Sequence, residues 1–197
     1  MKKLTSLLIA LLMLFGSISA NAETANASDA ASAEQQSRTL VVYYSATGTT
    51  QAIAEQIAAL TGADIFSLEP VTPYTDEDLN WRDRESRVVK EHEAGEKPVE
   101  LVSVEVEGWD NYDTVYIGYP IWWQDASWVM DAFVEGNDFT GKTVIPFCTS
   151  QASGYGESGA HLAEKAGTGN WIDGSNFYGT ATEEEVSDWL KTINTPQ

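Results

Sequence analysis

Short, continuous apolar runs alternate along this chain with segments whose apolar residues recur at helical spacing. A short continuous apolar run is typical of a strand that is buried on both faces. The pattern predicts five strands, of which the last is interrupted by Gly and Asn. The predicted strands span residues 40–44, 64–68, 114–118, 143–148 and 171–178.

Helical periodicity marks most of the segments that join or follow these strands. Ile53, Ile57 and Leu60 form one apolar stripe, and Thr182 with Glu185 forms a capping box at the start of the last helix. The predicted helices span residues 50–60, 128–135, 157–166 and 182–193. Strands that alternate with helices are parallel and joined by right-handed crossovers. The chain therefore predicts an α/β fold, an open sheet with helices on both faces.

The long connection between the second and third predicted strands carries two further patterns. Residues 76–94 mix Arg, Lys, Asp and Glu, which favours a solvent-exposed helix that ends at Gly95. A surface patch for a partner protein is the alternative interpretation of this segment. Residues 99–106 alternate between apolar and polar, which predicts an edge strand.

Open α/β sheets bind ligands beyond the carboxyl ends of their strands, so the residues that follow each strand are the candidates for chemistry. The connection after the first strand carries hydroxyls at Ser45, Thr47, Thr49 and Thr50, with Gly48 among them. Hydroxyls, backbone amides and a helix N-terminus together suit an anion. The connection contains no Lys or Arg, which excludes a nucleoside-triphosphate loop and favours a single phosphate monoester. A Ser/Thr-rich turn with a helix cap is the alternative.

Two more segments follow the third and fourth strands. After the third strand come Pro120, Ile121, Trp122 and Trp123, and one indole is suited to stack on a flat ring while the other packs inward. The alternative is that both indoles belong to the core or to an interface. After the fourth strand come Thr149, Ser150, Gly154 and Tyr155. Small residues there allow backbone amides to approach a ligand edge, and the tyrosine is suited to cover the other side of the ring.

The three segments together resemble the flavodoxin family. In that family the first loop reads Ser/Thr-x-Thr-Gly-x-Thr and holds the phosphate of flavin mononucleotide (FMN), and residues 45–50 match it position by position. The motifs Gly-Tyr-Pro-Ile-Trp-Trp at 118–123 and Gly-Lys-Thr-x-x-Pro-Phe-Cys-Thr-Ser at 141–150 resemble one flavodoxin-like branch. The resemblance implies a three-layer flavodoxin-like sandwich with five parallel strands in the order 2-1-3-4-5, and one bound FMN.

The same resemblance assigns roles to single residues. It implies that Trp122 stacks on the isoalloxazine ring with Trp123 beside it. It also implies that Thr149, Ser150 and Gly154 line the pyrimidine side of the ring. Flavodoxins often carry Gly after the stacking Trp, which lets that peptide turn over. This chain has Trp123 at that position, and the bulky side chain makes the turn less easy.

Three functions fit this resemblance. An electron carrier between protein partners is favoured by the small size and the acidity of the chain. An FMN-dependent NAD(P)H:quinone or small-molecule oxidoreductase is the alternative, because the Pro-x-Trp-Trp pattern is similar to that of quinone reductases. A binding module that retained the fold and lost the flavin is the third, and the intact first and third segments argue against it.

The N-terminal residues form a separate pattern. Two lysines precede an apolar run over residues 4–15, and small residues at 20–22 suit signal peptidase. The predicted organisation is a signal peptide at 1–22, a flexible leader at 23–37 and the folded domain at 38–197. We therefore expect export across the cytoplasmic membrane to the periplasm or the cell exterior, without stable membrane insertion of the mature chain. A retained membrane anchor is the alternative.

The net charge and the side-chain types of the chain limit the partners, disulfides and metal sites that we expect. The formal net charge of −19 repels nucleic acid and anionic lipid, and it suits a redox partner with a basic surface. Solubility alone is the other explanation of that charge. The single cysteine, Cys148, permits no internal disulfide and is expected in the core, and no Cys-x-x-Cys is present. His92 and His161 have no metal-ligand spacing, so no metal site is expected.

Overall fold

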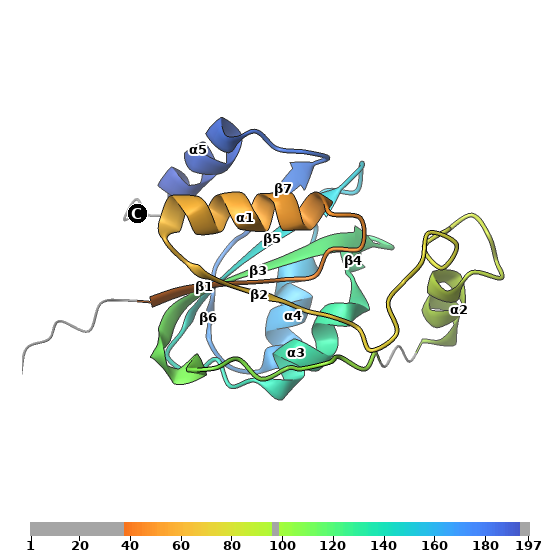
Figure 1. The fold of residues 1–197 in the computed structure, drawn as a ribbon, viewed down its shortest axis with the longest axis horizontal. Helices are drawn as coiled ribbons and strands as arrows, with labels where there is room; N and C mark the ends of the chain where they lie inside the picture. Colours follow the sequence, from red (N-terminus) through yellow and green to blue (C-terminus); the bar gives the residue numbers. More distant parts are fainter. Residues whose placement is uncertain (1–37, 96–98, 194–197) are drawn as a thin grey trace, which may run out of the picture. The chain divides into compact units, whose positions relative to one another are not determined.

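The computed structural model describes residues 38–95 and 99–193. The predicted signal peptide and leader lie outside the described residues, as do residues 194–197 of the predicted domain. Within the described part, a parallel sheet stands between two layers of helices (Figure 1).

The sheet has the strand order β2-β1-β3-β5-β6, and this confirms the predicted order 2-1-3-4-5. Its main strands are β2 (Asp64–Ser67), β1 (Arg38–Tyr43), β3 (Tyr112–Trp122) and β5 (Thr143–Ser150). The fifth strand consists of two short pieces, β6 (Asn170–Trp171) and β7 (Ser175–Tyr178), which both pair with β5 in parallel. Gly174 lies between the two pieces, and a Cβ at this position would lie 2.1 Å from the carbonyl oxygen of Pro146, so the close approach to β5 requires glycine.

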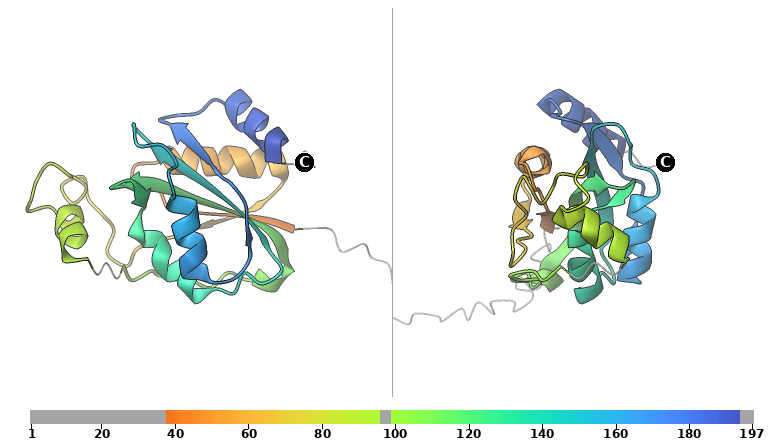
Figure 2. Two further views of the ribbon diagram at one scale, coloured as in Figure 1. Left: turned by 180° about the vertical axis from the view of Figure 1, so that it is seen from behind. Right: turned by 90° about the vertical axis from the view of Figure 1, so that its right-hand side faces the viewer.

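Helices cover both faces of the sheet, as predicted (Figures 1 and 2). The helices α1 (Thr49–Thr61) and α5 (Glu183–Ile193) lie on one face, and α3 (Asp131–Gly136) and α4 (Ser158–Ala166) lie on the other. Successive strand residues point to opposite faces of the sheet. Val41 therefore belongs to the same core cluster as Ile53 of α1, whereas Val42 belongs to the cluster that contains Phe133 of α3. Cys148 lies in the core, as predicted.

The third strand is longer than the sequence pattern predicts. β3 continues to Trp122 and turns back as β4 (Asp125–Ala126), with Trp122 paired to Asp125. Trp123 and Gln124 form the turn, and their φ angles are +49° and +67°. Positive φ at both central residues is the requirement of a type I′ hairpin turn. The Trp-Trp segment is therefore a strand end and a tight hairpin, where the prediction had a loop. Thr149 and Ser150 likewise belong to the end of β5.

The charged segment at 76–94 is helical only in its last part. The helix α2 spans Arg87–Ala94, and Ser86 caps it by accepting a hydrogen bond from the amide of Val89. Residues 76–86 form successive turns in place of the predicted helix. Side-chain oxygens of Asp78, Asn80 and Asp83 accept hydrogen bonds from nearby backbone amides, and these local bonds compete with helical ones.

The predicted edge strand at 99–106 is wrong. This segment makes one isolated antiparallel bridge, between Leu101 and Pro70, and then leaves the extended pairing. The hydroxyl of Ser103 donates to the carbonyl of Glu105 and accepts from its amide, which closes a local turn where a ladder would have continued. No helix of the described residues is long and apolar enough to cross a membrane.

Candidate functional site

The connection from β1 to α1 ends in a tight turn at the start of the helix. Gly48 adopts a left-handed conformation (φ +85°) immediately before α1, which lets the chain turn sharply into the helix. No described side chain caps this helix start, and the first turn contains no acidic residue. The amides of a helix's first turn carry the positive end of its dipole, so this start is available to an anion.

The hydroxyls of the same connection fit such an anion. The Ser45 Oγ atom is buried and has no hydrogen-bond partner among the described residues. A buried hydroxyl without a partner is costly, so a ligand oxygen that pairs with it would stabilise the protein. The Thr47 and Thr49 hydroxyls lie 3.4 Å apart at the exposed rim of the connection. The hydroxyls and amides of this connection are thus neutral donors, and the anion cradle built from them stays a prediction.

A buried hydrogen bond joins the first and third predicted segments. The Oγ1 atoms of Thr50 and Thr149 lie 2.8 Å apart, and both residues are buried. This contact brings the start of α1 against the end of β5, although the two residues are 99 positions apart. Because its hydroxyl already has this partner, we expect Thr50 to meet an anion through its amide.

Trp122 lies within a cluster of aromatic rings at the end of β3. Its ring centroid is 5.9 Å from Tyr44, 5.2 Å from Tyr74 and 4.7 Å from Trp128. All three contacts are edge-to-face, at interplanar angles of 87°, 69° and 67°. No described aromatic ring lies parallel to Trp122, which is only partly buried. A planar ligand would supply the stacked contact that this indole lacks.

Trp123 has a different environment. Its indole stacks on His92 at a centroid distance of 4.4 Å and an angle of 18°, and 39% of the residue remains exposed. The two residues before the Trp pair extend the hairpin: Ile121 pairs with Ala126, and the carbonyl of Pro120 accepts from the Ser127 amide at 3.0 Å. One face of Trp123 is therefore already covered, and Trp122 is the better candidate for a cofactor wall.

The segment after β5 is held by side-chain hydrogen bonds. The Ser150 hydroxyl donates to Asn176 Oδ1 at 2.8 Å and accepts from the Gly154 amide at 3.2 Å. Gly154 has a positive φ of +73°, which favours glycine at this turn. Asn176 on β7 thus fixes the beginning of the segment, and its own Nδ2 atom is buried without a partner among the described residues.

The structure places Tyr155 against the core. A Cβ at Gly159 or Gly174 would collide with the Tyr155 ring, so two glycines make room for this side chain. Burial raises the pKa of the Tyr155 hydroxyl, although its hydrogen bonds oppose the change. The aromatic side chain that stands exposed beside Gly154 is Tyr178, at the end of β7 and 64% accessible.

A family model described as flavodoxin matches residues 38–193. The chain belongs to the flavodoxin family. No match was found among the curated proteins.

Solved structures support this assignment to the flavodoxin family. A candidate flavoprotein from Bacteroides eggerthii is 38% identical, with a TM-score of 0.73, over 81% of this chain and 99% of that protein. A second candidate flavoprotein, from Bacteroides uniformis, is 37% identical with the same TM-score over 79% and 98%. A flavoprotein from Lactobacillus acidophilus, solved in complex with FMN, shares the fold at 20% identity, with a TM-score of 0.54 over 78% and 99%.

Several residues around the candidate site have no local signal in the sequence. Tyr44 ends an apolar run and was recognisable only as a strand residue, while Tyr74, Glu91 and Trp128 come from distant segments. The carboxylate of Glu91 accepts hydrogen bonds from the Tyr74 hydroxyl and the Trp128 indole at 2.6 and 2.8 Å. These contacts depend on how residues 68–95 pack against the end of β3 and the residues that follow β4.

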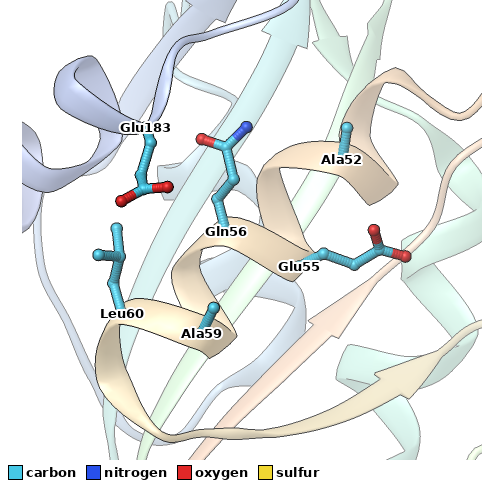
Figure 3. A pocket seen from close by; sticks show the side chains of 6 residues that line it. All are labelled: Ala52, Glu55, Gln56, Ala59, Leu60 and Glu183. Atoms are coloured by element: carbon cyan, nitrogen blue, oxygen red, sulfur yellow. The ribbon is translucent and has the colours of Figure 1, made fainter.

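Two surface hollows lie near this fold's helices. The larger, of about 520 Å³, lies between α1 and α5 (Figure 3) and is lined by Ala52, Glu55, Gln56, Ala59, Leu60 and Glu183. Its two carboxylates would repel a phosphate, so it does not suit FMN. The smaller, of about 260 Å³, adjoins Trp122, Trp123 and His92.

Proposed function

We propose that this chain binds one FMN at the carboxyl edge of its sheet and carries electrons between protein partners outside the cytoplasm. The observation that carries the proposal is the convergence of three separate segments at one edge. The Thr50–Thr149 hydrogen bond joins the first segment to the third, and the Tyr44–Trp122 contact joins the first to the second.

The anion cradle would hold the FMN phosphate. Ser45 would supply a buried hydroxyl that has no partner among the described residues, Thr47 and Thr49 would supply two more hydroxyls, and the first turn of α1 would supply amides. Neutral donors at a helix start bind a phosphate without an adjacent cation. This arrangement suits a single phosphate group in a protein whose net charge is −19.

The ring of FMN would lie between Trp122 and the segment after β5. Trp122 would stack on it, while Ser150 and Gly154 would border its polar edge. Bound FMN would supply the oxidation–reduction chemistry, and the protein would orient the ring and exclude water from one face. The Lactobacillus flavoprotein, which shares the fold, was solved with FMN and gives this cofactor independent support.

The carrier role rests on size and charge. The described chain is one sheet with its helices, and its acidity suits a partner with a basic surface. The net negative charge of the chain disfavours the anionic reduced flavin, so we expect a reduction potential below that of free FMN. A redox titration that gives a potential at or above that of free FMN would contradict this expectation.

Export is supported by the sequence of the N-terminus, where two lysines precede an apolar run.

An FMN-dependent NAD(P)H:quinone oxidoreductase is the second candidate. The hollow of about 260 Å³ beside Trp122 and Trp123 favours it, because a small acceptor could enter there. The acidity of the chain opposes a polyanionic nicotinamide donor.

One experiment separates the two functions. The mature chain, loaded with FMN, is given NADH or NADPH together with a soluble quinone. In parallel, the chemically reduced protein is mixed with basic and acidic redox proteins in a stopped-flow instrument. A carrier transfers electrons quickly to the basic protein, with a rate that falls as salt rises, and oxidises nicotinamide negligibly. Rapid steady-state turnover with the quinone would favour the enzyme instead.

A further inference from the structure

The carboxylate of Glu91 collects hydrogen bonds from three segments of the chain. Its Oε1 accepts from Arg87 Nε at 2.6 Å, and its Oε2 accepts from the Tyr74 hydroxyl at 2.6 Å and the Trp128 indole at 2.8 Å. The Glu91 side chain is 21% exposed, so water competes little for these donors. One side chain of α2 thus ties together the loop before the helix and the segment after β4.

Two of the residues that donate hydrogen bonds to Glu91 also pack against the Trp122 ring. Tyr74 and Trp128 each meet the Trp122 ring edge-to-face, at centroid distances of 5.2 and 4.7 Å. Trp122 has a third neighbour, Tyr44, which belongs to the connection that carries the anion cradle. The orientation of Trp122 therefore depends on rings whose polar atoms are bonded to Glu91.

Arg87 extends this arrangement to the loop. Its guanidinium lies 3.9 Å from the Tyr74 ring centroid, and its Nη1 donates to the carbonyl of Thr72 at 2.7 Å. Tyr74 is thus held through its hydroxyl by Glu91 and through its ring by Arg87. Burial, together with the hydrogen bond to Glu91, raises the pKa of the Tyr74 hydroxyl, so it remains a proton donor.

Figure 1 shows the connection that carries α2 beyond the carboxyl ends of the central strands, on the side where the β1–α1 connection turns. A plain solvent-exposed helix would make no contact with this edge. Here its Glu91 bonds to Trp128, and its His92 stacks on Trp123. Both contacts fall on the Trp-Trp hairpin and its continuation.

We infer that Glu91 is the positioning residue of the cofactor wall, and that the 68–95 connection is a functional part of the site. The inference rests on the proposed FMN function, since it assigns Trp122 to the ring of that cofactor. Glu91 would act through Tyr74 and Trp128, which fix the plane on which the ring stacks.

The test compares Glu91→Gln with Glu93→Gln in the otherwise unchanged protein. Glu93 lies on the same helix and is exposed, so its variant controls for loss of one negative charge. We expect Glu91→Gln to raise the FMN dissociation constant by about tenfold, because Arg87 loses its carboxylate and Tyr74 and Trp128 lose their charged acceptor. Glu93→Gln should stay within about twofold of wild type.

A second measurement needs no flavin. The near-UV circular dichroism of the FMN-free protein reports the mutual orientation of the aromatic rings, and it should change in Glu91→Gln but not in Glu93→Gln. Thermal unfolding of each variant separates disorder of the wall from general destabilisation. If Glu91→Gln does not fold, Tyr74→Phe removes the hydroxyl that donates to Glu91, keeps the ring, and should weaken FMN binding in the same direction.

Equal FMN affinities and equal near-UV spectra for the two glutamate variants would overturn the inference, even if Glu91→Gln lowered the melting temperature. A wild-type protein that did not bind FMN would contradict the proposed function instead. The near-UV comparison would then still decide whether Glu91 orders the rings around Trp122.

Discussion

Trp122 and Trp123 are neighbours in sequence but have different surroundings, and this difference makes their roles testable. Trp122 lacks a parallel partner, whereas Trp123 is already stacked on His92. We predict that Trp122→Ala weakens FMN binding by about 1–3 kcal/mol, since the indole face is lost. Trp123→Ala should weaken FMN binding clearly less than Trp122→Ala does. Isothermal titration of both variants checks this order, and a larger loss for Trp123→Ala would reverse the assignment.

The Thr50–Thr149 contact permits a double-mutant cycle. Thr50→Val or Thr149→Val alone leaves one buried hydroxyl without its partner, which should lower the free energy of unfolding by about 1–3 kcal/mol. Replacing both removes both polar groups, so the double variant should be less destabilised than the sum of the single ones. Urea unfolding measures all four proteins. Additive losses would show that the two hydroxyls contribute independently.

At the scale of whole elements, the last helix shows how a local motif becomes structure. The Glu185 carboxylate accepts from the Thr182 amide at 2.8 Å, and the Thr182 hydroxyl accepts from the Glu185 amide at 3.3 Å. This confirms the predicted capping box. The amide and the hydroxyl of Thr182 lower the pKa of Glu185.

This lowered pKa predicts a pH dependence of stability. A carboxyl whose pKa is lower in the folded state stabilises the protein above its unfolded pKa of about 4.3, and the effect is lost as the pH falls through the folded value. Glu185→Gln should therefore have a lower melting temperature than wild type at neutral pH, with the difference shrinking on acidification. Glu184→Gln is the control, and an equal pH profile for both variants would contradict the prediction.

The elements that the sequence predicted are those with a local cause. Continuous apolar runs such as 40–44 and 143–148 became central strands, and the hydroxyl-rich turn at 45–50 lies at the start of α1. At Ser103, side-chain hydrogen bonds to Glu105 compete with the hydrogen bonds of a strand. The alternation of apolar and polar residues at 99–106 therefore predicted a strand wrongly. The position of α2 against the Trp-Trp hairpin depends on contacts of Glu91 across 17 and 37 residues, which no local pattern encodes.

The sequence also did not predict the backbone conformation of the Trp-Trp hairpin. A type I′ turn ordinarily selects Asn or Gly, because both central residues need positive φ. Trp123 and Gln124 occupy those positions instead. Trp123 stacks on His92 of α2, a contact between segments that are far apart in the sequence and that no local pattern predicts.

At the scale of the whole molecule, the protein presents a large negative charge to an anionic cofactor. The sequence has 30 acidic and 11 basic residues, yet the proposed phosphate cradle contains no cation. Raising the salt concentration from about 0.01 M to about 0.15 M shortens the screening length from about 30 to 8 Å. We predict that FMN affinity rises or stays within about twofold over this range. A steep fall with salt, measured by flavin fluorescence, would indicate a cationic phosphate site instead.

The most direct test is a paired titration of the purified mature chain with FMN and with riboflavin, which lacks the phosphate. We predict a yellow complex with one FMN per chain, and an affinity for riboflavin at least about tenfold weaker, because Ser45 and the start of α1 would have nothing to bind. A protein that stayed colourless, or that bound riboflavin as tightly as FMN, would contradict the proposal that this helix start captures a phosphate.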